Sequence, residues 1–504
     1  MSELPKGWKL LQIDEVTEIV SGGTPKSTNP EYYTDEHANG IAWITPADLS
    51  GYKAHSISHG RRSITKKGYE ACSAKLMPKG TVLFSSRAPV GYVVIAENEI
   101  STNQGFKSFV PCKCVDSKFL FFYLKSIKHL AESLATGTTF KELSGKVAKT
   151  LPFPLAPLAE QKRIVAKLDE VLAQVDTIKA RLDRIPAILK RFRQSVLASA
   201  TSGIVSKTWR ELNSPILTCK DELVEKVFTE WCKSKEAEFS RKGKLPKNEK
   251  WKEKFPKPDF GEKPVPCWNA INLASVAEVI DPNPSHRMPK YVDDGLPFIS
   301  SENIVSLSCI NFVKGKKIQE EELEKQKARY EVRDGTFAFT RIGTIGKSVL
   351  LPQPHKYGVS HAMAIVNPFQ SLIDSRFLIL SMNCKSILSQ AHEGVQSVGV
   401  PDLGIGKMKS FIIPLPSIEE QKEIVRLVDQ YFAFADTIEA QVKKAQARVD
   451  NLTQSILAKA FRGELVAQDP NDEPADKLLE RIAKARTEAE QLAKAAKKAV
   501  KSQR

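Results

Sequence analysis

One segment of this chain occurs twice at a constant offset, and this repeat constrains the fold more than any other feature. Residues 160–165 read Glu-Gln-Lys-Arg-Ile-Val, and residues 420–425 read Glu-Gln-Lys-Glu-Ile-Val, 260 positions later. The same offset relates residues 194–198 to residues 454–458, and Gly203 to Gly463. Because no insertion separates these matches, the two segments are expected to form equivalent structural units.

Both copies carry an apolar stripe in which the spacing alternates between four and three residues. The stripe comprises Ile164, Leu168, Val171, Val175, Ile178, Leu182, Ile185, Leu189, Phe192 and Val196 in the first copy, and Ile424, Val428, Tyr431, Ala435, Ile438, Val442, Ala445, Val449, Leu452 and Ile456 in the second. Such a period predicts coiled-coil helices, each about 60 Å long at ~1.5 Å per residue. The alternative is that each helix packs only on its own domain. Gly203 and Gly463 are expected to cap the helices, and Pro186 is expected to kink the first or remove one hydrogen bond.

The segments before the helices repeat more loosely. Trp8 matches Trp268 at the same offset, and residues 80–85 resemble residues 335–340 at an offset of 255. Buried strands are predicted at 81–85, 91–95, 107–111, 347–351 and 362–366, whereas periodicity leaves the apolar runs 119–124 and 377–382 undecided. We therefore predict an α+β fold with two mixed α/β domains, joined by two long antiparallel coiled-coil helices in a pseudo-two-fold internal repeat.

Six regions follow from this pattern. Residues 1–150 and 263–410 form the two globular domains, and residues 151–208 and 411–467 form the two helical regions. Residues 209–262 are a charged connector, with a possible helix near 221–233, and residues 468–504 are a basic tail whose role is open: it docks on a partner or frays.

The charge of the chain indicates a polyanionic partner. The net charge is +16 and the isoelectric point is about 9.3, which favours nucleic acid but does not define a fold. Cys112 and Cys114 alone are close-set, no His cluster completes a metal site, and free thiols are expected. No apolar run approaches the ~20 residues that span a membrane.

Motifs for catalysis are missing. Residues 29–32 read Asn-Pro-Glu-Tyr and lack the second proline of an adenine methyltransferase motif. Residues 343–348 resemble the end of a phosphate-binding loop, but the loop is too short, and the acidic and basic residues of 258–263 lie in the connector with nuclease-unlike spacing. The chain is expected to bind without catalysing.

The helical motifs resemble those of one known family. Pro-Leu followed by Glu-Gln-Lys-x-Ile-Val, Ala-Asp-Thr-Ile-Glu at 435–439, and Gln-Ser-Ile-Leu-Ala-Lys-Ala-Phe-Arg-Gly-Glu-Leu at 454–465 are similar to the specificity subunit of type I restriction-modification enzymes. Residues 4–8 and 21–25 also resemble its target-recognition domains, so the resemblance covers nearly the whole chain. Two departures are the long connector and Pro186.

The resemblance implies a non-catalytic subunit with two target-recognition domains at 1–150 and 263–410. It implies binding of a bipartite, asymmetric site in double-stranded DNA, two modification (methyltransferase) subunits and, through them, two restriction (motor-nuclease) subunits. S-adenosylmethionine, ATP and Mg²⁺ are implied for those partners and no cofactor for this chain. A bacterial cytoplasmic location is implied, at the nucleoid when DNA is bound, with no membrane contact.

Residues for these roles are proposed from their types and places. Basic and polar side chains in loops can neutralise phosphates or read base edges. The candidates for DNA binding are Arg61, Arg62, Lys66, Arg87, Thr138, Thr139, Lys141, Lys316, Lys317, Arg341, Lys347, Gln396 and Ser397. The candidates for the helix pair and partner binding are Ile164, Leu168, Val175, Leu182, Ile424, Val428, Ile438 and Val442. Two other functions stay open: a self-contained restriction-methylation enzyme, which the missing motifs argue against, and a coiled-coil DNA-binding scaffold without sequence preference.

Overall fold

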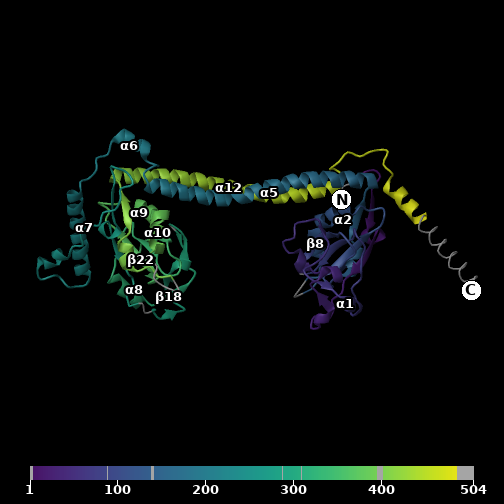
Figure 1. Ribbon diagram of the computed structural model, residues 1–504, viewed down its shortest axis with the longest axis horizontal. Helices are drawn as coiled ribbons and strands as arrows, with labels where there is room; N and C mark the ends of the chain where they lie inside the picture. The colour runs from purple at the N-terminus through teal and green to yellow at the C-terminus, as the bar shows by residue number, and fades with distance from the viewer. Residues whose placement is uncertain are drawn as a thin grey trace, which may run out of the picture. The chain divides into compact units, whose positions relative to one another are not determined.

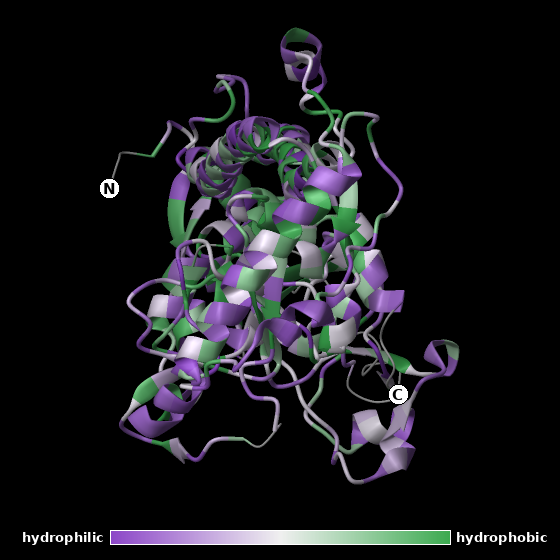
Figure 2. Ribbon diagram, turned by 90° about the vertical axis from the view of Figure 1, so that its left-hand side faces the viewer, coloured by the Kyte–Doolittle hydropathy of each residue, from purple (hydrophilic) through white to green (hydrophobic). Residues whose placement is uncertain are grey.

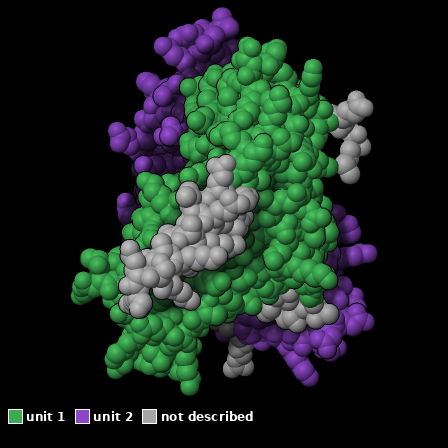
Figure 3. All heavy atoms as spheres, turned by 90° about the vertical axis from the view of Figure 1, so that its right-hand side faces the viewer, with its two compact units in different colours: residues 1–183, 443–504 green, residues 184–442 purple. Residues whose placement is uncertain are grey.

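The computed structural model describes residues 4–87, 89–137, 141–285, 288–307, 309–393 and 401–484. The chain divides into two compact units, shown in separate colours in Figure 3. Unit 1 comprises Met1–Asp183 and Lys443–Arg504, and unit 2 comprises Arg184–Val442. Each unit therefore contains one globular domain and parts of both long helices (Figure 1).

The domain of unit 1 has a five-stranded sheet, a four-stranded sheet and a two-stranded pair. The five-stranded sheet has the order β2 (Thr17–Ser21), β10 (Phe106–Pro111), β7 (Val82–Ser86), β8 (Val90–Ala96), β5 (Ser56–Ile57). The four-stranded sheet has the order β3 (Tyr33–Thr34), β6 (Ser63–Ile64), β4 (Ile41–Ile44), β9 (Ser101–Thr102), and the pair joins β1 (Lys9–Gln12) to β11 (Pro152–Leu155). The helices of this domain are α1 (Lys66–Glu70), α2 (Ser117–Ser126), α3 (Lys128–Leu134) and α4 (Gly145–Lys149).

The domain of unit 2 repeats this plan. Its main sheet has the order β13 (Ala277–Ile280), β22 (Met363–Pro368), β19 (Phe337–Thr340), β20 (Ser348–Leu350). Its second sheet has the order β14 (Tyr291–Val292), β18 (Lys316–Ile318), β15 (Leu296–Ile299), β21 (Gly358–Val359), and two pairs join β12 (Asn269–Asn272) to β23 (Ile412–Leu415) and β16 (Ile304–Ser306) to β17 (Cys309–Ile310). The helices are α8 (Glu320–Lys327), α9 (Ser375–Met382), α10 (Lys385–Glu393) and α11 (Ile405–Lys409). Figure 2 views the molecule from the side of unit 2, where apolar residues gather inside and hydrophilic residues on the outer segments.

The predicted strands are confirmed, and the two undecided apolar runs are helices. Residues 119–124 and 377–382 lie in α2 and α9, where all of them are buried. Each helix begins at an aspartate, Asp116 or Asp374, whose side chain accepts hydrogen bonds from the backbone N–H groups two and three residues later. Burial on all sides explains why these helices show no polar face in the sequence.

The two long helices are α5 (Leu158–Thr201) and α12 (Ile418–Phe461). The predicted caps are confirmed, since Gly203 and Gly463 have φ of 76° and 72°, a backbone conformation that glycine adopts without strain. Pro186 lies inside α5, which continues through it.

Within each unit, one end of α5 lies beside the other end of α12. In unit 1, the Lys179 ammonium lies 2.6 Å from the Asp450 carboxylate, and Val175 shares a hydrophobic core with Val449. In unit 2, the Arg193 guanidinium lies 2.6 Å from the Asp436 carboxylate. Most stripe residues that follow one another at steps of seven are buried (Leu168, Val175, Leu189, Val196, Val428, Ala435, Val442, Val449 and Ile456), whereas Leu182 of the same series is half-buried. Among the positions between, Ile164 and Ile424 near the starts of the helices are also buried, whereas Ile178 and Leu452 are both 45% exposed.

The connector and the described part of the tail are folded. The connector contains α6 (Lys207–Asn213), α7 (Lys220–Arg241) and a 3₁₀ helix, η5 (Glu249–Lys254), so the predicted helix near 221–233 is confirmed and longer. In the tail, Ala475 and Leu478 are buried in the core of unit 1, and the Ala475 N–H donates to the Gly7 carbonyl.

Two further features concern the cysteines and the membrane. Cys112 and Cys114 form a disulfide, so the expectation of free thiols is wrong for this pair. From the sequence, their spacing of two residues is considered only as part of a metal site and not as a disulfide. None of the described helices is long and apolar enough to cross a membrane.

Candidate nucleic-acid interface

The small four-stranded sheets of the two domains are equivalent, although their sequences differ. In unit 1, Ile64 pairs with both Tyr33 and Ile41 across antiparallel strands, and β4 then pairs with β9 in parallel. In unit 2, Ile318 pairs with both Tyr291 and Leu296, and β15 pairs with β21 in parallel. This register makes Arg62, two residues before Ile64, the counterpart of Lys316.

In both sheets a cation lies over the ring of an equivalent tyrosine. The Arg62 guanidinium carbon lies 5.3 Å from the centre of the Tyr33 ring, and the Lys316 ammonium lies 4.2 Å from the centre of the Tyr291 ring. A second aromatic ring supports each tyrosine, with Trp43 at 5.8 Å from Tyr33 and Phe298 at 6.0 Å from Tyr291. Arg62 and Lys316 are exposed, so each sheet presents an oriented cation beside an aromatic surface.

The other basic candidates near these sheets are exposed or half-buried. Arg61, just before β6, and Lys66, the first residue of α1, are exposed, and the Arg61 backbone N–H donates to the Asp48 carboxylate at 2.9 Å. Lys317 is half-buried on β18, and Lys347 is exposed where β20 begins. The structure thus groups Arg61, Arg62 and Lys66 in unit 1, and Lys316 with Lys317 in unit 2.

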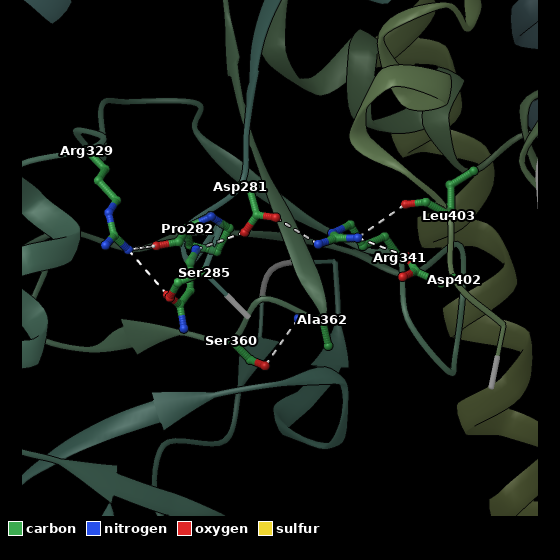
Figure 4. Close-up of polar contacts among 10 residues, drawn as sticks. Asp281, Pro282, Ser285, Arg329, Arg341, Ser360, Ala362, Asp402 and Leu403 are labelled. Carbon is green, nitrogen blue, oxygen red and sulfur yellow. Dashed lines mark hydrogen bonds and ion pairs between the residues drawn. The ribbon is translucent and has the colours of Figure 1, made fainter. Parts of the chain in front are cut away.

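Arg341 occupies a different environment from these surface cations. Its side chain is 3% exposed and lies between two carboxylates, 2.8 Å from Asp281 and 3.0 Å from Asp402. Figure 4 shows the guanidinium directed to Asp281 on one side and to Asp402 and the Leu403 carbonyl on the other. In this structure Arg341 holds the segment before α11 against the main sheet, and a contact of Arg341 with a base stays a prediction.

The globular domains of unit 1 and unit 2 are called domain 1 and domain 2. Domain 1 fixes the segment that corresponds to the one before α11 with other residues. Glu142 stands where domain 2 has Asp402, because Leu143 and Leu403 donate to the carbonyls of Ser86 and Arg341, respectively. The Glu142 carboxylate lies 3.4 Å from the buried Lys107 ammonium and 3.8 Å from the Arg87 guanidinium. Ser86, not Arg87, is therefore the positional counterpart of Arg341, and Arg87 is half-buried in its ion pair. The offset of 255 that relates residues 335–340 to residues 80–85 gives the same pairing of Arg341 with Ser86.

The remaining polar candidates lie mostly outside the described residues. Thr138, Thr139, Gln396 and Ser397 fall in the segments 138–140 and 394–400, which the structure does not describe. Lys141 is described and exposed. Glu142 and Asp402, which form the ion pairs described above, follow these two segments closely in sequence.

The repeated Glu-Gln motif attaches each domain to its long helix. Glu160 accepts a hydrogen bond from the Trp8 indole at 2.9 Å, and Glu420 accepts one from the Trp268 indole at 2.8 Å. The neighbouring Gln161 side chain donates to two backbone carbonyls and accepts from the Asp116 N–H. Both glutamates and both glutamines of the repeat are at most 1% exposed. The sequence identity of the motif therefore reflects a buried polar junction. The sequence shows that Trp8 and Trp268 repeat, but it does not show that they bind the glutamates of the motif.

The second partner of each glutamate comes from the segment that follows a long helix. In unit 1 the Gln468 amide donates to Glu160 at 2.6 Å, and the raised pKa of this carboxyl follows chiefly from its burial. In unit 2 the Arg210 guanidinium and the Ser206 hydroxyl donate to Glu420 at 2.5 Å and 2.7 Å. The two junctions share their acceptor and their tryptophan but differ in charge.

The helix-pair candidates are largely buried in their units. Ile164, Leu168 and Val175 belong to the core of unit 1, and Ile424 and Val428 to the core of unit 2. Val442 is 6% exposed, and Leu182 and Ile438 are half-buried. Across the described part of the chain, no group of three or more His, Cys, Asp or Glu side chains could hold a metal ion.

The chain thus contains two domains of one plan, each with a cation over a tyrosine in its small sheet and a Glu-Gln junction with its long helix. The model of the type I restriction modification DNA specificity domain matches residues 5–187 and again residues 267–446. The chain belongs to the family of type I restriction-modification specificity subunits.

Relatives of known name agree with this assignment. The chain is 30% identical to the type I restriction enzyme EcoKI specificity subunit of Escherichia coli K12 over 493 residues, which cover 92% of this chain and 91% of that protein. It is 32% identical to the Escherichia coli EcoBI specificity subunit, over 76% of this chain and 77% of that protein. A chain from a structure describing assembly and conformational transition of a type I restriction-modification system has a similar fold, with a TM-score of 0.56 and 18% identity over 92% of this chain and 100% of that one.

Proposed function

We propose that this chain is the non-catalytic subunit that selects the DNA sequence for a type I restriction-modification complex. Each target-recognition domain reads one half of a bipartite, asymmetric site, and partner subunits then methylate adenine or cleave the DNA. The observation that carries this proposal is the pair of equivalent sheets, in which Arg62 with Tyr33 and Lys316 with Tyr291 occupy the same register with different chemistry.

Different side chains at equivalent positions favour different half-sites. An arginine makes a bidentate contact with guanine, whereas a lysine supplies a single charged group. The loops beside these sheets also differ in sequence, while the Glu-Gln junctions are conserved between the domains. The two copies therefore share the junction that attaches each domain to its long helix. They differ in the small sheet and loops that are proposed to contact the bases.

The long helices are proposed to form an antiparallel coiled coil that binds the partners. The half-exposed apolar positions Ile178 and Leu452 lie on the helix pair of unit 1, and Tyr431 and Phe434, at 44% and 60% exposed, on that of unit 2. Such residues suit two modification subunits, which in turn carry two restriction subunits. S-adenosylmethionine, ATP and Mg²⁺ are proposed to act in these partners, in the cytoplasm and at the nucleoid.

A methylation map tests the function. The chain is co-expressed with its modification subunit in a host without adenine methylation, and modified adenines are located by sequencing. We expect a bipartite, asymmetric motif with a fixed unspecified gap, and exchange of residues 1–150 for those of another specificity subunit should change only one half. A single continuous motif, or methylation that does not depend on this chain, would contradict the proposal and favour a scaffold without sequence preference.

A further inference from the structure

The connector between the two repeats forms a rigid hairpin on domain 2. Helix α7 and the returning segment with η5 pack through an aromatic cluster, in which Trp231 lies 5.6 Å from Trp251 and 5.4 Å from Phe255, and Phe239 lies 5.4 Å from Trp251 (ring centres). Five aromatic side chains contribute (Phe228, Trp231, Phe239, Trp251 and Phe255). A flexible spacer needs no such core, so the hairpin is a built structure.

The hairpin is attached to domain 2 at several points. Leu223 and Val227 of α7 are 3% and 1% exposed and belong to the core of unit 2. Ser234 donates a hydrogen bond to Glu278 of β13, and the Arg241 guanidinium lies 4.0 Å from the Glu331 carboxylate. The tip of the hairpin is therefore held at a fixed place on this domain.

Charge is distributed unevenly along the hairpin. The stem, residues 220–240, contains four lysines and six acidic residues, whereas the tip, residues 241–257, contains eight basic residues and two glutamates. In the stem, Lys226, Lys233 and Lys235 each lie within 2.8 Å of a glutamate oxygen. In the tip, Lys244, Lys247, Lys250, Lys254 and Lys257 are exposed, and the structure pairs none of these described lysines with a carboxylate.

From this arrangement we infer that the tip of the connector hairpin binds the phosphates of duplex DNA beside the half-site read by domain 2, outside the bipartite site. The exposed, unpaired lysines of the tip can neutralise a row of phosphates, and each such contact releases counterions. Figure 1 shows α7 at one end of unit 2, next to α6, whereas α5 and α12 leave this unit at its opposite end. The contact therefore adds affinity without sequence preference and rests on the proposed function.

Two triple variants of the full chain, assembled with its modification subunits, test this inference. The tip variant carries Lys244→Gln, Lys247→Gln and Lys250→Gln. The matched control carries Lys226→Gln, Lys233→Gln and Lys235→Gln, which remove the same charge from the stem. Binding is measured by fluorescence anisotropy over a range of salt concentrations, with duplexes that end at the second half-site or extend past it by about one helical turn (~10 base pairs).

We expect the wild-type protein and the stem variant to bind the extended duplex more tightly than the short one. The tip variant should lose this gain, and its salt slope on the extended duplex should be shallower by about 3, one for each phosphate contact. An equal gain for the tip variant would overturn the inference, as would a loss of partner binding that does not depend on the flank, which would point to a protein ligand. If the wild-type protein binds a scrambled site as tightly as the specific one, the proposed function fails instead. Thermal unfolding of all three proteins checks that the variants are folded.

Discussion

At the scale of single residues, the buried glutamates of the two junctions share a position but not an electrostatic environment. Glu160 has neutral donors from Trp8 and Gln468, whereas Glu420 also has the Arg210 guanidinium, whose side chain is 13% exposed. Burial raises the pKa of Glu160, because the buried carboxylate loses hydration that it keeps in the unfolded chain. The corresponding contribution of Glu160 to stability is present at low pH and is lost as the pH rises through the raised pKa.

We therefore predict opposite tolerance to the same substitution. Glu160→Gln keeps an acceptor for Trp8 and removes a buried charge, so its cost at neutral pH should stay below about 1 kcal/mol. Glu420→Gln leaves Arg210 without its counter-charge and should cost about 2–4 kcal/mol. Urea unfolding followed by hydrogen exchange measures the free-energy cost of Glu160→Gln in unit 1 and of Glu420→Gln in unit 2. Equal costs for the two variants would show that Arg210 does not determine the difference.

Arg341 gives a second prediction at this scale. Arg341→Ala removes the buried guanidinium that lies between Asp281 and Asp402 and should destabilise unit 2 by about 2–5 kcal/mol. Arg62→Ala removes an exposed cation, should leave stability within about 0.5 kcal/mol, and should weaken binding of the first half-site only. Thermal unfolding and binding to duplexes altered in one half-site separate the two effects. A change in the recognised bases by Arg341→Ala, with unaltered stability, would instead support base reading by Arg341.

At the scale of elements, the heptad stripe predicts the two long helices correctly but does not predict which of its residues are buried. The sequence predicts both helices, their glycine caps and the strands on which the cores of the domains are built. It treats all stripe positions alike, whereas Ile164 is fully buried, Leu182 is half-buried and Ile178 is 45% exposed. Burial at each position depends on which neighbours lie alongside, which periodicity does not contain.

This difference predicts separate roles for two neighbouring positions of α5. Val175→Asp places a charge in the core shared with Val449, so it should destabilise unit 1 by about 3 kcal/mol or more. Ile178→Ser should leave unfolding unchanged within about 0.5 kcal/mol and weaken binding of a modification subunit. Thermal unfolding and co-purification with that subunit measure the two outcomes. Full partner binding by Ile178→Ser would exclude this exposed position from the interface.

The reading surfaces were harder to find because insertions change the offset between the repeats. Trp8 and Trp268 are 260 residues apart, but Tyr33 and Tyr291 are 258 apart, and Arg62 and Lys316 are 254 apart. Arg62 and Lys316 were selected as basic residues, yet their equivalence depends on strand pairing that an alignment at constant offset cannot reveal. The buried pairs of Arg341 and Lys107 were missed for a related reason: their partners lie 35 to 61 residues away.

At the scale of the whole molecule, each globular domain is completed by the segment that follows a long helix. In unit 2 this segment carries Ser206 and Arg210, which bind Glu420. In unit 1 it begins after Gly463 and carries Gln468 and Asp472. The repeat therefore extends beyond the helices, into segments whose sequences share little more than the capping glycine.

Removal of residues 464–504 should thus affect one unit selectively. The truncation deletes Gln468, the buried Leu478 and Asp472. The side chain of Asp472 is 8% exposed, and its carboxylate lies 2.6 Å from the Arg163 guanidinium. Unit 1 should lose protection against hydrogen exchange while unit 2 keeps it, and discrimination should weaken at the first half-site, because Glu160 and Trp8 lose their cover. Glu473→Gln, which alters only an exposed ion pair with Arg481, is the matched control and should change neither unit. An equal loss of protection in both units would mean that the tail does not belong to domain 1 alone.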